Sequence, residues 1–297
     1  MKKIILIISV LFAQDTFSIV AIDPQTGQIG SAGASCISGS IIISDIRPGV
    51  GAIHTQSYWT SGNQNYASDL MEAGYSPNQI IDSLVENDSG NNPTIRQYGI
   101  VDIYNNEVRA AAFTGENCFD YKGHILGETY AIQGNILLGN EVLEEMESRF
   151  LNTDGELSER LMASLQGANI PGADIRCIDD SLSSLSAFIR VANTYDEEDD
   201  YFLDINVNNV EFVGYHIDPI DSLQFLFDEW YLNNLNYTLG DINQDQNIDI
   251  LDVVSIINII LNIYSPTLIE TLSADINEDQ IINIQDIIIL IAIILDD

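Results

Sequence analysis

Apolar and polar residues alternate along much of the chain from Thr16 onward, and this alternation predicts β-strands. Residues 16–23 (TFSIVAID) and 28–36 (QIGSAGASC) are two such stretches, joined by a turn signal at 24–27. Further strands are predicted over 49–57, 97–105, 107–115, 129–137, 184–193 and 201–207, and two asparagines at 105–106 predict a hairpin between two of these strands.

Helical spacing of apolar residues separates the groups of strands. It predicts helices over 65–74, 76–87, 140–152, 157–168 and 218–235. Ser76 is a good N-cap for the second of these helices, and Pro77 suits its first position. Two groups of strands with helices between them indicate an α+β domain over residues 16–236, with stacked sheets covered by helices.

The first residues have the composition of an export signal. Lys2 and Lys3 precede an apolar run at 4–12, and Ala13 is a small residue suited to the cleavage site. We therefore predict a signal peptide and a short propeptide over residues 1–15, and a secreted or extracellular protein. No membrane span is expected, because this run and the later apolar run at 287–295 are both shorter than the roughly 20 residues that a span needs.

The tail contains one segment twice. GDINQDQNIDILDVVSIINIIL begins at Gly240, and ADINEDQIINIQDIIILIAIIL begins 34 residues later at Ala274. Acidic, amide and apolar residues follow the same order in both copies, and a helix is predicted after each polar loop. Residues 237–297 are therefore predicted to form a separate small module.

The repeated loops have the spacing of calcium ligands. Each copy offers side-chain oxygens at loop positions 1, 3, 5, 9 and 12 and a main-chain carbonyl at position 7. Carboxylates this close repel one another without a cation, so two Ca2+ ions are expected to contribute to folding. The predicted ligands are Asp241, Asn243, Asp245, Asn247, Asp249 and Asp252 in the first loop, and Asp275, Asn277, Asp279, Ile281, Asn283 and Asp286 in the second.

This duplicated pattern resembles the type I dockerin module over residues 240–297. The resemblance implies a small helical calcium-binding module and a cohesin-like scaffold or cell-surface partner, and such modules are typical of polysaccharide-degrading assemblies. The chain departs from the pattern at position 6, where Gln246 and Gln280 replace the usual glycine. A left-handed backbone there costs roughly 1 kcal/mol when a side chain is present.

A second departure concerns the partner. The residues just before the last aspartate of each loop are Ile250-Leu251 and Ile284-Gln285, whereas dockerins that bind cohesins usually have small hydroxyl residues there. The resemblance therefore supports calcium binding more directly than cohesin binding.

Charge excludes some classes of binding partner, and the cysteine content limits the possible disulfides. The chain has 45 acidic and 10 basic residues, a formal net charge of −35. Nucleic acid and anionic membrane surfaces are excluded as partners, because both require clustered Lys and Arg. The three cysteines, Cys36, Cys118 and Cys177, allow one disulfide and one remaining thiol, and the sequence leaves the pair open.

Thr16 stands where the leader ends and the first strand begins. An N-terminal threonine combines a hydroxyl nucleophile with its own base, an α-amine whose pKa is about 8. Signal cleavage after Ala13 leaves Gln14 and Asp15 ahead of Thr16, so a further cut is needed to expose it.

Most of residues 16–226 resemble one family. The matching stretches are 16–35, 47–57, 96–102, 114–125, 130–139 and 171–192, and they resemble the domain of unknown function 1028 family, which is similar to N-terminal-nucleophile hydrolases. The resemblance implies a four-layer αββα domain and makes Thr16 the candidate nucleophile. It implies no particular substrate, so the substrate is an unknown small molecule or peptide.

Polar residues at strand ends are the other site candidates. Asn135, next to Gly134, is a candidate donor to the oxyanion that forms during acyl transfer. Ser35, Thr55 and Gln56 are expected to line the same pocket. Asp174 and Arg176 are expected either to bind a charged substrate group or to pair with each other.

Two functions from different classes follow. One is a secreted hydrolase of amide or related acyl bonds that uses Thr16 and carries a calcium-binding tail for scaffold or surface attachment. The other is a non-catalytic binding or accessory component of an extracellular assembly. A glycosidase is less favoured, because the front domain shows no evident pair of catalytic carboxylates.

Overall fold

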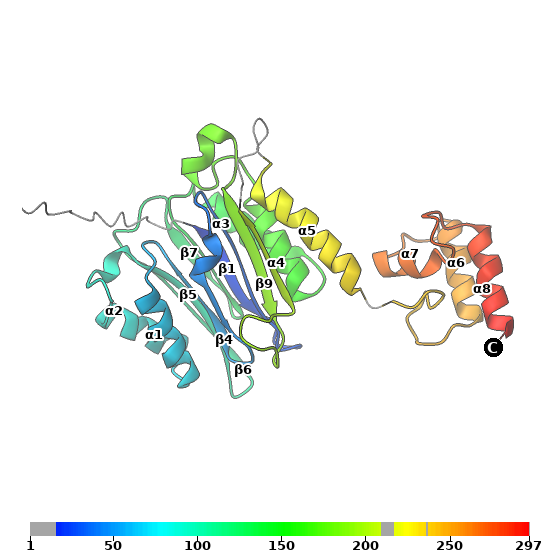
Figure 1. Ribbon diagram of the computed structural model, residues 1–297, viewed down its shortest axis with the longest axis horizontal. Helices are drawn as coiled ribbons and strands as arrows, with labels where there is room; N and C mark the ends of the chain where they lie inside the picture. The colour runs from blue at the N-terminus through cyan, green and yellow to red at the C-terminus, as the bar shows by residue number, and fades with distance from the viewer. Residues whose placement is uncertain (1–15, 209–216, 236, 297) are drawn as a thin grey trace, which may run out of the picture. The chain divides into compact units, whose positions relative to one another are not determined.

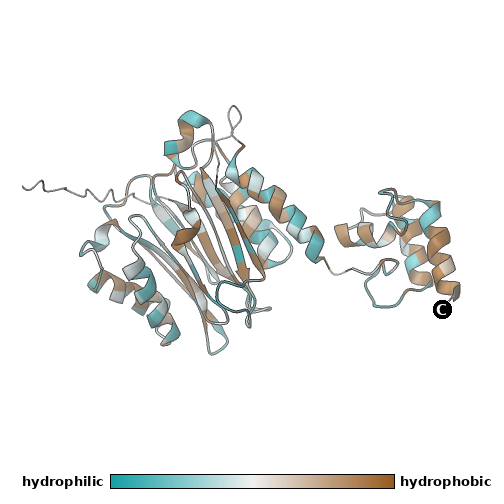
Figure 2. Cartoon of the chain, in the orientation of Figure 1, coloured by the Kyte–Doolittle hydropathy of each residue, from teal (hydrophilic) through white to brown (hydrophobic). Residues whose placement is uncertain are grey.

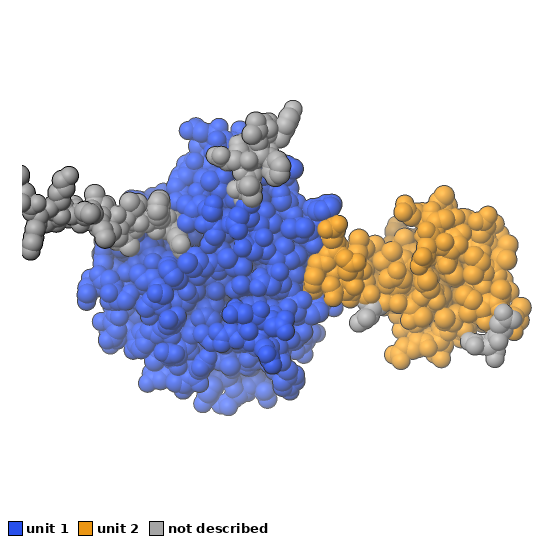
Figure 3. Space-filling view, viewed as in Figure 1, with its two compact units in different colours: residues 1–227 blue, residues 228–297 orange. Residues whose placement is uncertain are grey.

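The computed structural model describes residues 16–208, 217–235 and 237–296. The chain divides into two compact units, residues 1–227 and 228–297, which are treated separately below (Figure 3). The predicted signal peptide and propeptide at 1–15 lie outside the described residues, as does residue 236, the last residue of the predicted front domain. The division falls within helix α5 (Pro219–Asn234), and the predicted domain boundary at 236 stays a prediction.

Two antiparallel sheets form the centre of unit 1 (Figure 1). The six-stranded sheet has the order β10-β9-β2-β1-β8-β7, and the four-stranded sheet has the order β3-β4-β5-β6. β1 is an interior strand, paired with β2 on one side and β8 on the other. The strands are β1 Phe17–Ile22, β2 Ile29–Ser35, β3 Ser44–Arg47, β4 Gly51–Gln56, β5 Gln97–Tyr104, β6 Glu107–Thr114, β7 Gly123–Leu126, β8 Tyr130–Gly134, β9 Ser186–Ala192 and β10 Leu203–Asn208.

The sheets pack face to face and helices cover their outer faces. Val20 of β1, Ile46 of β3 and Val101 of β5 meet in a wholly buried cluster between the sheets. Helices α1 (Ser61–Glu72) and α2 (Pro77–Glu86) pack on the four-stranded sheet, whereas α3 (Glu141–Asn152) and α4 (Leu157–Gly167) pack on the six-stranded sheet. This order of layers confirms the predicted four-layer αββα fold.

Local sequence signals account for several of these elements. Helix α2 begins at the predicted cap: Ser76 and Gln79 form a reciprocal capping box, and Pro77 is the first helical residue. Asn105 and Asn106 have φ values of 53° and 64°, which fits the predicted two-residue hairpin between β5 and β6. Strands β3 and β7 were not predicted, because four residues are too short for a periodic signal.

Unit 2 contains helices α6 (Ile250–Ile260), α7 (Leu268–Ala274) and α8 (Ile284–Asp296). As predicted, α6 and α8 each follow one of the repeated loops, and Figure 2 shows both as strongly hydrophobic helices. Their inner faces meet in a buried cluster that includes Ile242, Val253, Ile256, Ile287 and Leu290. Within the described ranges, no helix is both long enough and apolar enough to cross a membrane.

Candidate functional site

Thr16 lies immediately before β1 and is wholly buried. Its main-chain carbonyl accepts two hydrogen bonds, one from Gln56 Nε2 at 3.0 Å and one from the main-chain N of Asn135 at 3.1 Å. One donor comes from each sheet. The start of β1 is therefore fixed at the junction of the two sheets.

The strand register places Thr16 opposite the other predicted catalytic residue. Phe17 pairs with Gly134 in the β1–β8 ladder, so the next pair is Thr16 with Asn135. Alternation along β1 puts the side chains of Thr16 and Ser18 on one face, and Ser18 Oγ donates at 2.6 Å to a glutamine of the other sheet. The Thr16 side chain therefore faces the layer between the sheets, beside the side chain of Asn135.

Three buried amides form a network in this layer. Gln97 Oε1 accepts from Gln56 Nε2 at 2.8 Å and from Asn135 Nδ2 at 2.9 Å. Gln97 Nε2 lies 2.8 Å from Thr114 Oγ1 and 2.9 Å from the carbonyl oxygens of Gly123 and Gly134. Gln97 is central to the network, but no sequence signal distinguishes it, because a polar residue at a strand start is common.

Ser35, Asp174 and Arg176 meet on the other side of β1. Phe17 pairs with Ala34, so Ser35 follows as the neighbour of Thr16 in β2. Arg176 and Asp174 form a bidentate ion pair, with Nε to Oδ1 at 2.9 Å and Nη2 to Oδ2 at 2.5 Å. Arg176 Nη2 also donates to Ser35 Oγ at 3.4 Å. Of the two roles predicted for Asp174 and Arg176, the structure shows the pairing with each other.

A disulfide holds this region together. Cys36, just after β2, is bonded to Cys177 in the short helix η3 (Ile175–Asp180), with their Cα atoms 5.8 Å apart. Cys118 is a buried thiol whose Sγ donates to the main-chain carbonyl of Arg96 at 3.3 Å. The fold decides the cysteine pairing that the sequence left open.

Thr55 and His54 are neighbours on β4, and their side chains face opposite sides of the four-stranded sheet. Thr55 alternates with Gln56 on β4, so its side chain shares a face with Ile53, which packs in the cluster beneath α1 and α2. His54 faces the layer between the sheets, with Nε2 2.6 Å from Ser31 Oγ. Burial and, to a lesser extent, the charge of Arg190 lower the pKa of His54 from 6.5 to about 3, so its imidazole is neutral.

In unit 2, the first repeated loop is a compact turn. The main-chain N of Asp245 donates to Asp241 Oδ1 and to Asn243 Oδ1, each at 3.0 Å. The wholly buried Asp252 closes the loop, with Oδ1 accepting from Asn243 N at 3.2 Å and Oδ2 from Asp249 N at 2.9 Å. The predicted ligands at positions 1, 3, 5, 9 and 12 are thus brought together.

The second loop repeats these contacts at equivalent positions. Asp279 N donates to Asp275 Oδ1 at 3.1 Å and to Asn277 Oδ1 at 3.0 Å. The buried Asp286 accepts from Asn277 N at 3.3 Å and from Asn283 N at 2.8 Å. Two loops with the same hydrogen bonds offer two equivalent sets of ligands.

The donor chemistry of both loops fits calcium. All predicted ligands are oxygens, and the main-chain carbonyls of Asn247 and Ile281 complete the two predicted sets. The Ile281 carbonyl also accepts from Asn283 Nδ2 at 3.0 Å. In the part of the chain that the structure describes, no three His, Cys, Asp or Glu side chains are gathered in metal-binding geometry.

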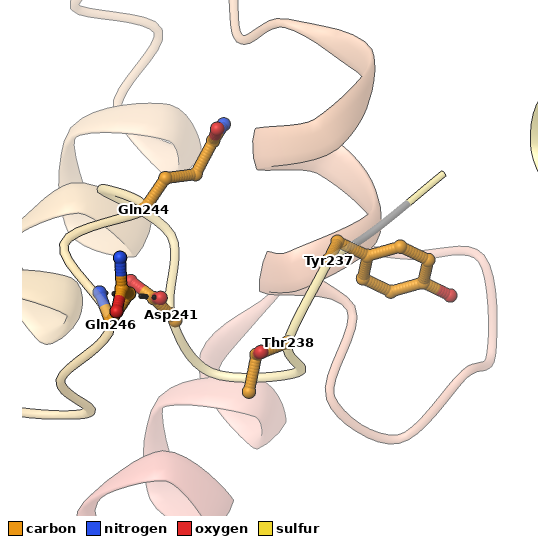
Figure 4. A pocket seen from close by; sticks show the side chains of 5 residues that line it. All are labelled: Tyr237, Thr238, Asp241, Gln244 and Gln246. Carbon is orange, nitrogen blue, oxygen red and sulfur yellow. Dashed lines mark hydrogen bonds between the residues drawn. The ribbon is translucent and has the colours of Figure 1, made fainter. Parts of the chain in front are cut away.

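At position 6 of both loops, where glutamine replaces the usual glycine, the backbone has the expected left-handed conformation. Gln246 has a φ of 69° and Gln280 a φ of 67°, both in the left-handed region. The main-chain N of Gln246 donates to Asp241 Oδ2 at 3.0 Å. A hollow of about 400 Å3 lies beside this loop. Five residues line it, and Figure 4 shows their side chains: Tyr237, Thr238, Asp241, Gln244 and Gln246.

Matching apolar stripes follow the two loops. Each stripe has four exposed residues at spacings of four, three and four, and the second stripe lies 34 residues after the first. Exposed apolar residues that gather on one helix face are candidates for an interaction site. The first stripe is Ile250, Val254 and Ile257 on α6 together with its C-cap residue Leu261. The second stripe is Ile284, Ile288, Ile291 and Leu295 on α8.

These features define a class of protein: an αββα domain with a threonine at the start of an interior strand, followed by a duplicated calcium-loop module. The family model of the Family of unknown function (DUF1028) matches residues 16–220, and the chain belongs to this family. The model of the dockerin type I domain matches residues 239–295. Dockerin type I domains bind calcium, and they bind cohesins of scaffold proteins in extracellular, cell-surface-attached assemblies.

Solved structures agree with the family assignment. A DUF1028 protein from Silicibacter pomeroyi is similar with a TM-score of 0.59 and 25% identity, covering 73% of this chain and 89% of that chain. No curated protein matches.

Two Anbu structures are more distant. Anbu from Yersinia bercovieri has a TM-score of 0.35 and 12% identity over 76% of this chain and 100% of that chain. An Anbu Gly-1 mutant from Hyphomicrobium sp. strain MC1 has a TM-score of 0.36 and 9% identity over 75% of this chain and 100% of that chain. Similarity this low supports no conclusion about function.

Proposed function

We propose that the protein is a secreted hydrolase of amide or related acyl bonds, with Thr16 as its N-terminal nucleophile. One observation carries the proposal: Thr16 begins an interior strand, and two donors from different sheets hold its carbonyl. A nucleophile must be held rigidly in this way if its hydroxyl and α-amine are to act together.

The reaction proposed is acyl transfer through the Thr16 hydroxyl. The oxygen attacks the substrate carbonyl carbon and forms the new C–O bond, while its proton passes to the α-amine. The tetrahedral intermediate then breaks the bond to the leaving amine, which takes that proton. Water, deprotonated by the same α-amine, hydrolyses the ester and regenerates the hydroxyl. The remaining Nδ2 hydrogen of Asn135 is the proposed donor to the oxyanion.

The tail is proposed to attach this domain to a cohesin-bearing scaffold. Two Ca2+ ions, one in each loop, would order the module through the carboxylate, amide and carbonyl oxygens described above. The stripes on α6 and α8 then provide apolar binding surface, in place of the hydroxyl contacts that the sequence lacks at 250–251 and 284–285.

The catalytic proposal is tested on the secreted protein. N-terminal sequencing should find Thr16 as the first residue, and periodate, which cleaves an N-terminal 1,2-amino alcohol, should oxidise it. The secreted protein is then assayed with a panel of small amides, esters and peptides. Thr16→Ala should abolish turnover, whereas Thr16→Ser retains a hydroxyl and should keep part of it.

A mature chain that keeps residues ahead of Thr16 contradicts catalysis by the α-amine. So does turnover that Thr16→Ala leaves unchanged. Either result, combined with calcium-dependent retention on a scaffold, favours the non-catalytic accessory component instead. Retention is measured by pull-down on a cohesin-bearing scaffold with and without a calcium chelator.

A further inference from the structure

The amide orientations between the sheets leave one buried oxygen of Asn135 without a partner. Gln97 Nε2 lies 2.9 Å from two main-chain carbonyls, which can only accept. The orientation of the Gln97 amide is therefore fixed, and its Oε1 must be the acceptor on the other side. Asn135 contacts that oxygen at 2.9 Å and must present its NH2 group to it.

It follows that Asn135 Oδ1 points away from Gln97. Rotating the Asn135 amide by 180° would set two carbonyl oxygens against each other. Asn135 is wholly buried, and Oδ1 has no hydrogen-bond partner among the described residues. Native structures rarely bury such an oxygen without a donor, and each case calls for an explanation.

The nearest element that gains a donor is the start of β1. Thr16 and Asn135 are directly opposite in the register, and their side chains share the inter-sheet face. Cleavage before Thr16 would replace its single peptide N–H with an α-ammonium group, which has three N–H donors. The oxygen without a partner therefore belongs to the residue that neighbours Thr16 across the strand pair, and Asn135 N itself donates to Thr16 O at 3.1 Å.

We infer that Asn135 Oδ1 accepts a hydrogen bond from the α-amino group of Thr16 in the mature protein. This inference rests on the proposed function and makes Asn135 a positioning residue for the base, in addition to its proposed oxyanion role. The bond orients the amine and holds its lone pair toward the Thr16 hydroxyl, which the amine deprotonates.

The test measures the pKa of the α-amine directly. The secreted protein is reacted with cyanate over a range of pH, and carbamylation of the peptide that begins at Thr16 is followed by mass spectrometry. In Asn135→Ala the charged amine loses an acceptor, and its pKa should fall by about one unit. In Asn135→Asp a carboxylate stands beside it, and the pKa should rise by about one unit or more.

Gln133→Ala is the matched control. Gln133 is on the same strand, equally buried, and its Oε1 also has no partner among the described residues, yet its register partner is Ser18. The α-amine pKa should stay at the wild-type value in this variant. Thermal unfolding of each variant confirms that it is folded, and opposite shifts in Asn135→Ala and Asn135→Asp cannot arise from general loosening of the core.

The outcomes separate this inference from the proposed function. If the mature chain begins at Thr16 but the α-amine pKa is the same in wild type and in both Asn135 variants, the inference is overturned. The proposal that Thr16 is the nucleophile is then unaffected. A role for Asn135 in oxyanion binding alone predicts the same unchanged pKa with reduced turnover. A mature chain that does not begin at Thr16 overturns both.

Discussion

Replacing Gln246 with glycine should tighten calcium binding by the tail. Gln246 and Gln280 have φ values of 69° and 67°, where an L side chain is strained. Removing that strain gains about 1–2 kcal/mol, and the greater freedom of glycine before folding offsets about 0.5–1 kcal/mol of it. About 0.5–1 kcal/mol per loop remains. Because folding of the loop is coupled to ion binding, the Kd for calcium at that loop should fall about two- to fivefold.

Isothermal titration calorimetry of the secreted full-length chain measures this effect. Gln246→Gly and Gln280→Gly should each tighten one site, and the double variant should tighten both. Gln246→Ala is the control, because it shortens the side chain and keeps the Cβ atom that causes the strain. Equal affinities in Gln246→Ala and Gln246→Gly would show that backbone strain does not limit binding, and the reasoning would be refuted.

Three further predictions concern the disulfide, the buried histidine and the stripes. Replacing Cys36 and Cys177 with alanine should lower the unfolding free energy by up to about 5 kcal/mol in urea denaturation, because the bond spans 141 residues; an unchanged midpoint would contradict this. The pKa of His54 is lowered from 6.5 to about 3 in the folded protein. As the pH falls, His54 is therefore protonated in the unfolded state before it is protonated in the folded state, and the unfolding free energy should fall by about 3 kcal/mol between pH 6.5 and about pH 4. His54→Gln should remove that part of the pH dependence of the unfolding free energy, and an unaltered profile would count against it. Val254→Asp with Ile288→Asp puts a charge in each stripe and should abolish scaffold pull-down while calorimetry shows the same calcium affinity; retained pull-down would exclude the stripes as the binding surface.

The sequence by itself determined the features that are encoded locally. The repeat in the tail, its ligand spacing and the helix after each loop can be read because all the residues concerned are close in the chain. The cap at Ser76 and the hairpin at 105–106 are local in the same sense. The layered α+β architecture followed from the order of strand and helix patterns, since the two periodicities differ.

Only the tertiary structure decided what surrounds Thr16. Gln56, Gln97 and Asn135 lie far apart in sequence, and their contact depends on the register of three strands in two sheets. The choice of Cys36 and Cys177 for the disulfide depends on the same packing. A strand pattern shows which residues share a face, but it carries no information on which distant strand that face will meet, because pairing is set by the packing of the whole core.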